Sequence, residues 1–95
     1  MTTSTLKTGQ AVLTNKVGLH ARPSVKLTQL AKAHESRIEF ALDPAGPWTD
    51  AKSPVKVMRV KAPMGVTLHF RVDGPDADAA LAALVDLVDR KFDEE

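Results

Sequence analysis

The sequence predicts an α+β domain, an open-faced β-sandwich in which three helices cover one face of a four-stranded antiparallel sheet. Two observations predict this fold class. Apolar and polar residues alternate over 37–42 and 66–72, which is typical of strands with one buried face. Segments 21–33 and 76–92 carry apolar residues at helical spacing instead. The expected order is β-α-β-β-α-β-α in a chain of 95 residues, which is too short for two domains.

The first expected element is a short strand near the N-terminus. Residues 1–8 are polar, and we expect a flexible segment there, followed by a single domain over 9–95. The strand is expected over 10–14, where Ala11 and Leu13 would face the core.

A turn and a helix follow this strand. We expect the turn over 15–18, because Gly18 can adopt backbone angles that other residues avoid. The helix is expected over 21–33, since Pro23 suits a first helical turn, where its missing N–H would lack a partner anyway. Its apolar face is predicted from residues at positions i, i+3, i+4 and i+7: Leu27, Leu30, Ala31 and His34.

The middle of the chain is expected to form a pair of strands. Alternation over 37–42 places Ile38, Phe40 and Leu42 on one face. Residues 43–47 are rich in turn formers and end that strand. A short partner strand is expected over 48–52, with Trp48 anchoring the connection.

The last three elements are expected to be a short helix, a strand and a long helix. Ser53 followed by Pro54 is a helix start signal, so we expect a helix over 54–60. The strand over 66–72 has alternating apolar residues, and Arg90 and Lys91 are expected in the last turn of the final helix. That helix carries an apolar stripe made of Leu81, Leu84, Val85, Val88 and Phe92.

Composition excludes several classes of function. The chain has no cysteine, so disulfides, thiol catalysis and thiolate metal sites are absent. Its net charge of +1 gives no overall attraction to nucleic acid or membranes. No apolar run approaches the roughly 20 residues of a membrane helix. We therefore expect a cytoplasmic protein without membrane insertion, and the sequence shows no spacing that would predict a metal or a cofactor.

The segment from Gly18 to Pro23 is the candidate site. His20 comes just before the predicted helix, where backbone N–H groups such as those of Ala21 and Arg22 lack helical acceptors and attract anions. A neutral imidazole is a nucleophile near neutral pH. A phosphoryl group placed on it would carry a charge of about −1.5 to −2 and could be balanced by the Arg22 guanidinium. On spacing alone, a polar cap or surface role for His20 is the favoured interpretation.

A family resemblance decides between these interpretations. The segment GLHARPSVKLTQLAK closely resembles the active-site helix of HPr, the histidine-containing phosphocarrier family of the bacterial phosphotransferase system. The resemblance continues through AKSPVKVM, Gly65 and DGPDADAALAAL, and it covers about 85 of the 95 residues. It implies a single HPr-like domain with the predicted open-faced fold.

The resemblance also implies a function. The histidine matching His20 is phosphorylated on Nδ1 by enzyme I, with phosphoenolpyruvate as the ultimate donor. It then passes the group to the A-component of a sugar permease or to a regulatory acceptor, while the arginine matching Arg22 balances the phosphate. We expect a monomer that carries phosphate and does not turn over a substrate as an enzyme does. Whether the chain serves sugar uptake or the nitrogen-related branch stays open.

Further residues match less firmly. Ser53 matches a serine that HPr kinase phosphorylates in some bacteria, but Pro54 departs from the aliphatic residue usual at the next position, so a plain helix cap is the favoured interpretation. Pro54, Val55, Lys56 and Met58 match the surface that family members press against their partners. Val17 and Lys61 depart from the small polar residue and the glycine that the family tends to have at those positions. Nearby cations that could steer an acidic partner are Lys26, Lys52, Lys56, Arg59 and Lys61.

Two alternatives to a phosphocarrier remain. One is a regulatory binding protein of the same fold that acts by protein contact, against which the retained His20 and Arg22 argue. The other is a nucleic-acid-binding domain, which would need exposed aromatic residues and a basic surface. Aromatic residues make up 4% of the chain, so we expect no nucleic-acid partner. His34 and His69 have no partner pattern and are expected to be structural or inert.

Overall fold

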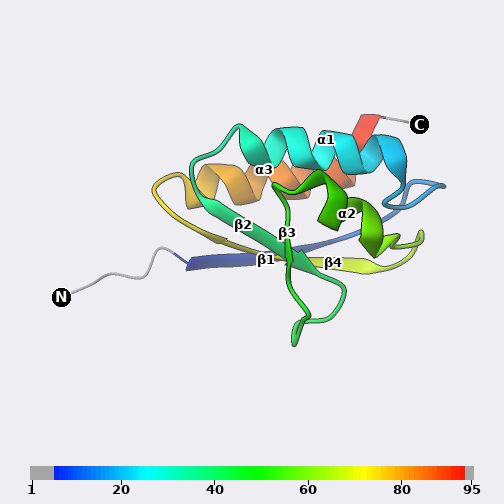
Figure 1. The fold of residues 1–95 in the computed structure, drawn as a ribbon, viewed down its shortest axis with the longest axis horizontal. Helices are drawn as coiled ribbons and strands as arrows, with labels where there is room; N and C mark the ends of the chain where they lie inside the picture. The colour runs from blue at the N-terminus through cyan, green and yellow to red at the C-terminus, as the bar shows by residue number, and fades with distance from the viewer. Residues whose placement is uncertain (1–5, 94–95) are drawn as a thin grey trace.

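The computed structural model describes residues 6–93, which form a four-stranded antiparallel sheet with the helices on one face (Figure 1). The elements in chain order are β1 (Leu6–Val12), α1 (Ala21–Lys32), β2 (Arg37–Ala41), β3 (Thr49–Asp50), α2 (Pro54–Val60), β4 (Thr67–Asp73), α3 (Ala77–Asp89) and the short turn η1 (Lys91–Asp93). The strand order is β1-β4-β2-β3. The predicted fold class and element order are confirmed. No helix within residues 6–93 is both long and apolar enough to cross a bilayer.

The core lies between the sheet and the helices. Phe40 of β2 pairs with Phe70 of β4, and Ile38 pairs with Val72, so the alternation seen in the sequence places these four side chains on the helix-covered face. All four are fully buried. Burial of each such side chain contributes about 1.5–3 kcal/mol. The helices supply further fully buried side chains, which include Leu27, Leu84 and Val88.

The first strand begins earlier than the sequence predicts. Residues 6–8, expected to be flexible, belong to β1, which pairs with β4 from Leu6↔Asp73 to Val12↔Thr67. Backbone pairing does not require apolar side chains, and this strand shows little alternation, so its polar start gave no signal. Residues 1–5 of the predicted flexible segment lie outside the described residues.

The predicted strand pair in the middle of the chain is also shorter than expected. β2 ends at Ala41, so Leu42 leaves the alternating pattern and is 41% exposed. The partner strand consists of Thr49 and Asp50 alone. Ala41 faces away from the helices, opposite His69, yet is 2% exposed. The far face of the sheet is therefore partly covered, and His69 on this face is half-buried.

The C-terminal end departs from a simple helix. α3 ends before Phe92, and Arg90 and Lys91, expected in its last turn, lie beyond it. Residues 91–93 adopt left-handed backbone angles, with φ between 56° and 58°. This turn still brings Phe92 into the core, where it is fully buried. Lys26 Nζ of α1 donates a 2.6 Å hydrogen bond to the Phe92 carbonyl and ties the turn to α1.

Asp76 joins two loops at the end of the molecule away from β3. Its carboxylate accepts hydrogen bonds from the backbone N–H of Glu35 at 3.1 Å and of Ser36 at 2.9 Å. The Ser36 hydroxyl donates to the same carboxylate. This side-chain hydrogen bond from Ser36 is the main cause that lowers the pKa of Asp76 below its ordinary value, and the backbone hydrogen bonds act in the same direction. Asp76 thus holds the α1–β2 loop against the start of α3.

We expect Asp76→Asn to lower the melting temperature at neutral pH, because an amide accepts these hydrogen bonds less strongly than a carboxylate. The native pKa lies below the unfolded value, so the stabilisation is present above about pH 4 and is lost as pH falls through the native pKa. Thermal unfolding from pH 7 to pH 2 should show the gap between variant and wild type closing in acid. Asp78→Asn is the control, since that exposed carboxylate pairs with Lys7 at 3.7 Å. An equal effect of both substitutions would contradict this role.

Candidate functional site

His20 lies at the N-cap of α1. Its backbone is extended, with φ −100° and ψ −164°, and its carbonyl accepts the first helical hydrogen bond, from the Ser24 N–H at 2.8 Å. The imidazole makes no capping hydrogen bond to its helix, and the residue is exposed. The ring nitrogens are therefore available to a reacting partner, directly beside the positive end of the α1 dipole.

The loop before His20 is held by contacts with the segment that follows α2. The Leu19 side chain is 1% exposed, and its N–H donates to the Ala62 carbonyl at 2.8 Å. Gly18 has φ +64°, and a Cβ at this position would lie 2.3 Å from the same carbonyl oxygen. The loop can approach the segment after α2 this closely because residue 18 has no side chain. These contacts set the position of His20 in space.

Asn15 is a positioning residue that the sequence did not single out. It is fully buried, and its Nδ2 donates a 2.7 Å hydrogen bond to the Gly18 carbonyl. The HPr family tends to have a small polar residue where this chain has Val17, and the Val17 side chain is 58% exposed. Asn15 supplies the hydrogen bond to this loop from inside the turn. The sequence offered one signal, an asparagine in a turn that ends at glycine, but this signal does not show that the asparagine is buried.

Ala21 and Arg22 form the start of α1. Both are exposed, and neither backbone N–H has a helical acceptor at these positions. Pro23 follows and has no N–H, and it is buried, as is Ser24. The first turn contains no acidic side chain. The exposed imidazole of His20 thus lies directly before Ala21 and Arg22, the first two residues of α1.

The short helix α2 presents the predicted apolar surface. Val57 is fully buried against the core, while Val55 is 59% exposed and Met58 is 45% exposed. Pro54 is exposed at the first position of the helix. Figure 1 shows α2 beside the half of α1 that begins at residue 21, and the two helices pack against each other. This short helix therefore has a packed face at Val57 and an exposed face at Pro54, Val55 and Met58.

Ser53 is the N-cap of α2. Its hydroxyl oxygen accepts a hydrogen bond from the Lys56 N–H at 3.4 Å, and Pro54 follows at the first helical position. At the other end, Lys61 has φ 50° and ψ 44°, the left-handed conformation that glycine adopts most easily. The turn therefore keeps a glycine-like backbone although residue 61 is lysine.

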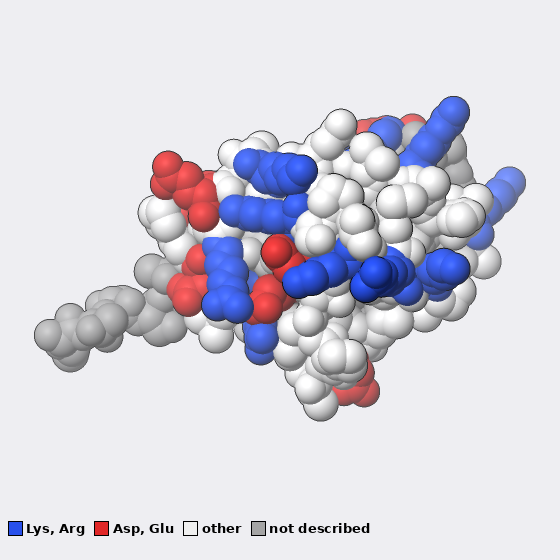
Figure 2. Space-filling view, viewed as in Figure 1, with Lys and Arg blue, Asp and Glu red and all other residues white. Residues whose placement is uncertain are grey.

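Of the five cations near the site, two donate hydrogen bonds to backbone carbonyls and three are exposed on or just after α2. Lys26 donates to the Phe92 carbonyl, and Lys52 Nζ donates to the His34 carbonyl at 2.8 Å. Lys56, Arg59 and Lys61 are exposed. Figure 2 shows Lys and Arg side chains gathered in a band across the face on which α2 lies.

The other two histidines lie apart from this arrangement. His34 Nδ1 is 3.0 Å from the Leu30 carbonyl near the end of α1, and His69 lies on β4. Within residues 6–93 no three His, Asp or Glu side chains gather as metal ligands.

Comparison with known proteins shows which family and which relatives the chain is similar to. The family model described as "PTS HPr component phosphorylation site" matches residues 7–90. The phosphocarrier protein HPr of Cupriavidus necator is 44% identical over 80 residues, which cover 84% of this chain and 88% of that protein. The phosphocarrier protein NPr of Shewanella violacea is 39% identical over 85 residues, covering 90% and 91%.

A solved structure agrees with these matches. The crystal structure of HPr from Thermoanaerobacter tengcongensis superimposes with a TM-score of 0.85 at 34% identity, over 94% of this chain and 98% of that one. Fold, family model and relatives therefore lead to one conclusion: this chain belongs to the HPr family, the phosphocarriers of the phosphotransferase system.

Proposed function

We propose that this protein carries a phosphoryl group on Nδ1 of His20, which it accepts from phosphorylated enzyme I. The observation that carries the proposal is the exposed imidazole at the N-cap of a twelve-residue helix, with no capping hydrogen bond of its own. In the transfer, the neutral ring nitrogen attacks the phosphorus, the new P–N bond forms and the bond to the donor breaks.

The surroundings of His20 fit a transient phosphate. The N–H groups at the start of α1 and the exposed Arg22 guanidinium would supply positive charge to a phosphate on His20. Because these groups are exposed, they hold the phosphate less firmly than a closed site would. Such a site suits a carrier, which must release the group to the next protein.

We propose that partners dock on the surface made of Pro54, Val55, Lys56 and Met58. The exposed apolar side chains give it a contact area, and Lys56, Arg59 and Lys61 would attract an acidic partner. The acceptor in this proposal is the A-component of a sugar permease or a regulatory protein of the nitrogen-related branch. A monomeric state and a cytoplasmic location belong to the same proposal.

Ser53 is proposed to act as a helix cap, because its hydroxyl oxygen already accepts the Lys56 N–H. Phosphorylation of Ser53 by HPr kinase would displace this contact. The alternative function, a regulatory binding protein acting by contact alone, predicts no phosphate on His20.

Incubation with phosphoenolpyruvate and the cognate enzyme I tests the proposal. We expect one acid-labile, base-stable phosphate per chain in the wild type and none in His20→Ala. The chain offers matched controls in its two other histidines, so His34→Ala and His69→Ala should label normally. Absence of label in the wild type, or equal label in His20→Ala, would overturn the proposal.

A further inference from the structure

Both methionines that the structure describes have exposed side chains. Met58 of α2 is 45% exposed, and Met64, in the segment after α2, is 56% exposed. The chain has no cysteine, so these two thioethers contain the sulfur atoms of residues 6–93, and the third methionine, Met1, lies outside that range. Methionine ranks among the residues that are most often buried in folded proteins, so two exposed ones are unusual.

Met64 lies against the loop that carries His20. A Cβ on Gly18 would lie 2.9 Å from the Met64 nitrogen. The N–H of the next residue, Gly65, donates a 2.7 Å hydrogen bond to the Leu13 carbonyl. The backbone of Met64 is therefore fixed against the segment before His20, while its side chain stays accessible to solvent.

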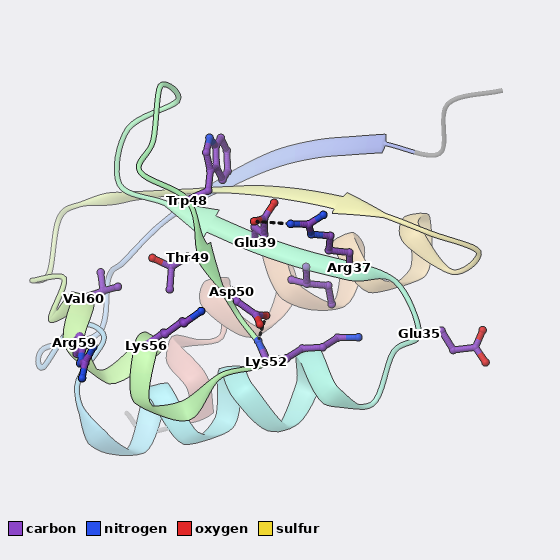
Figure 3. A pocket seen from close by; sticks show the side chains of 11 residues that line it. Glu35, Arg37, Glu39, Trp48, Thr49, Asp50, Lys52, Lys56, Arg59 and Val60 are labelled. Carbon is purple, nitrogen blue, oxygen red and sulfur yellow. Dashed lines mark hydrogen bonds and ion pairs between the residues drawn. The ribbon is translucent and has the colours of Figure 1, made fainter. Parts of the chain in front are cut away.

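Met58 lies on a side of α2 that faces neither the core nor the groove between α2 and β3. Val57 is the fully buried residue of this helix. Lys56 and Val60 line the groove (Figure 3), and neither Val55 nor Met58 is among its lining residues. Val55 and Met58 are three positions apart, so their side chains are neighbours on the helix surface. The helix therefore presents an apolar side made of these two residues to solvent.

Accessible thioethers react with peroxides, and the product is polar. The sulfur lone pair attacks one oxygen of hydrogen peroxide, the O–O bond breaks, and an S–O bond forms. The proton on the transferred oxygen moves to the other oxygen, which leaves as water, so the sulfur is oxidised and the peroxide is reduced. A partner that covers the sulfoxide with apolar atoms must then bury an oxygen that lacks a hydrogen-bond donor, which is unfavourable.

We propose that Met58 and Met64 are reversible oxidation sites, and that sulfoxides at these positions weaken docking of the phosphotransfer partner beside His20. The inference rests on the proposed function, since it needs the docking surface of α2 and phosphate transfer through His20. Peroxide is the oxidant. A sulfoxide reductase returns the thioether, with two thiols oxidised to a disulfide and the oxygen released as water.

The test compares phosphorylation of the full chain before and after treatment with hydrogen peroxide, which is removed before enzyme I and phosphoenolpyruvate are added. Peptide mass spectrometry should find one added oxygen on Met58 and one on Met64. The KM of enzyme I for the oxidised chain should rise about tenfold, while kcat stays close to that of the untreated chain. The melting temperature should not change, because both side chains lie outside the core. Sulfoxide reductase with a thiol should restore the original KM.

Two variants locate the effect. Met58→Leu/Met64→Leu keeps apolar side chains of similar volume without sulfur, so its KM should not respond to peroxide, although Met1 can still be oxidised. Adding Leu6→Met to this variant places a thioether at a position that is 49% exposed. Leu6 begins β1, at the opposite end of the molecule from the start of α1 (Figure 1). Oxidation there should leave the KM unchanged.

A polar substitution should reproduce the effect without any oxidant, so Met58→Gln/Met64→Gln should raise the KM in untreated protein. The proposal is overturned if neither methionine takes up oxygen, or if the oxidised chain keeps its KM. It is also overturned if the double leucine variant responds to peroxide as the wild type does, or if the melting temperature falls together with transfer. In all these outcomes the untreated chain still accepts phosphate. An untreated chain that accepts none overturns the proposed function, and this inference with it.

Discussion

Replacing Gly18 with alanine is expected to cost about 2–5 kcal/mol of unfolding free energy and to slow phosphorylation of His20. The left-handed backbone at φ +64° alone costs a non-glycine residue about 1–2 kcal/mol. The added Cβ would lie 2.3 Å from the Ala62 carbonyl oxygen and 2.9 Å from the Met64 nitrogen, so backbone must move, at a cost of about 1–3 kcal/mol more.

That movement acts directly on the site. The Ala62 carbonyl accepts the Leu19 N–H, and Leu19 precedes His20, so a displaced loop carries the imidazole with it. Urea unfolding and the initial rate of labelling by enzyme I would measure the two effects.

Gly65→Ala is the control for backbone strain. Gly65 also has a positive φ, +96°, but a Cβ there would meet no atom within 4 Å. It should lose about 1–2 kcal/mol from strain alone and leave the labelling rate close to that of the wild type. If Gly18→Ala loses no more stability than Gly65→Ala, close packing under the His20 loop is not what fixes the site.

The periodic spacing of apolar residues predicted the elements that have one buried face. Alternation in β2 and β4 placed Ile38, Phe40 and Phe70 on the buried face, and the structure confirms this. The cap signal at Ser53 and Pro54 predicted the start of α2, because capping is a local interaction. Local sequence was sufficient wherever one hydrophobic face or one cap determined the element.

Long-range contacts account for what the sequence did not predict. β1 starts at Leu6 because β4 pairs with it, and backbone pairing leaves no side-chain signal. Phe92 fits the helical stripe of α3, yet it reaches the core through a left-handed turn tied to Lys26, 66 positions away in the chain. Spacing cannot distinguish these two routes to the same buried position.

Some residues of the candidate site could be predicted from the local sequence, and others could not. His20 and Arg22 lie within three residues, so the helix start and the family resemblance predicted them together. The burial of Asn15 and its hydrogen bond to the Gly18 carbonyl depend on how the loop is folded. Those features emerge only in the folded chain.

Replacing Arg22 with glutamate is expected to slow phosphorylation of His20 by about 10- to 100-fold while leaving the fold intact. The substitution reverses a charge two residues from the phosphate acceptor and opposes a group carrying about −1.5 to −2. The first turn of α1 has no acidic residue, and a carboxylate there interacts favourably with the helix dipole. The variant should therefore fold normally and accept phosphate more slowly.

Lys32→Glu makes the same charge reversal at the other end of α1 and separates local from overall electrostatics. Lys32 is exposed in the last turn, about 15 Å along the axis from Arg22 and beyond the roughly 8 Å screening length at physiological salt. A carboxylate at a helix C-terminus is unfavourable, so this variant should be slightly less stable yet label at the wild-type rate. If both variants slow labelling equally, the effect of Arg22 is that of net charge on partner encounter; if only Arg22→Glu does, the guanidinium acts on the phosphate at His20.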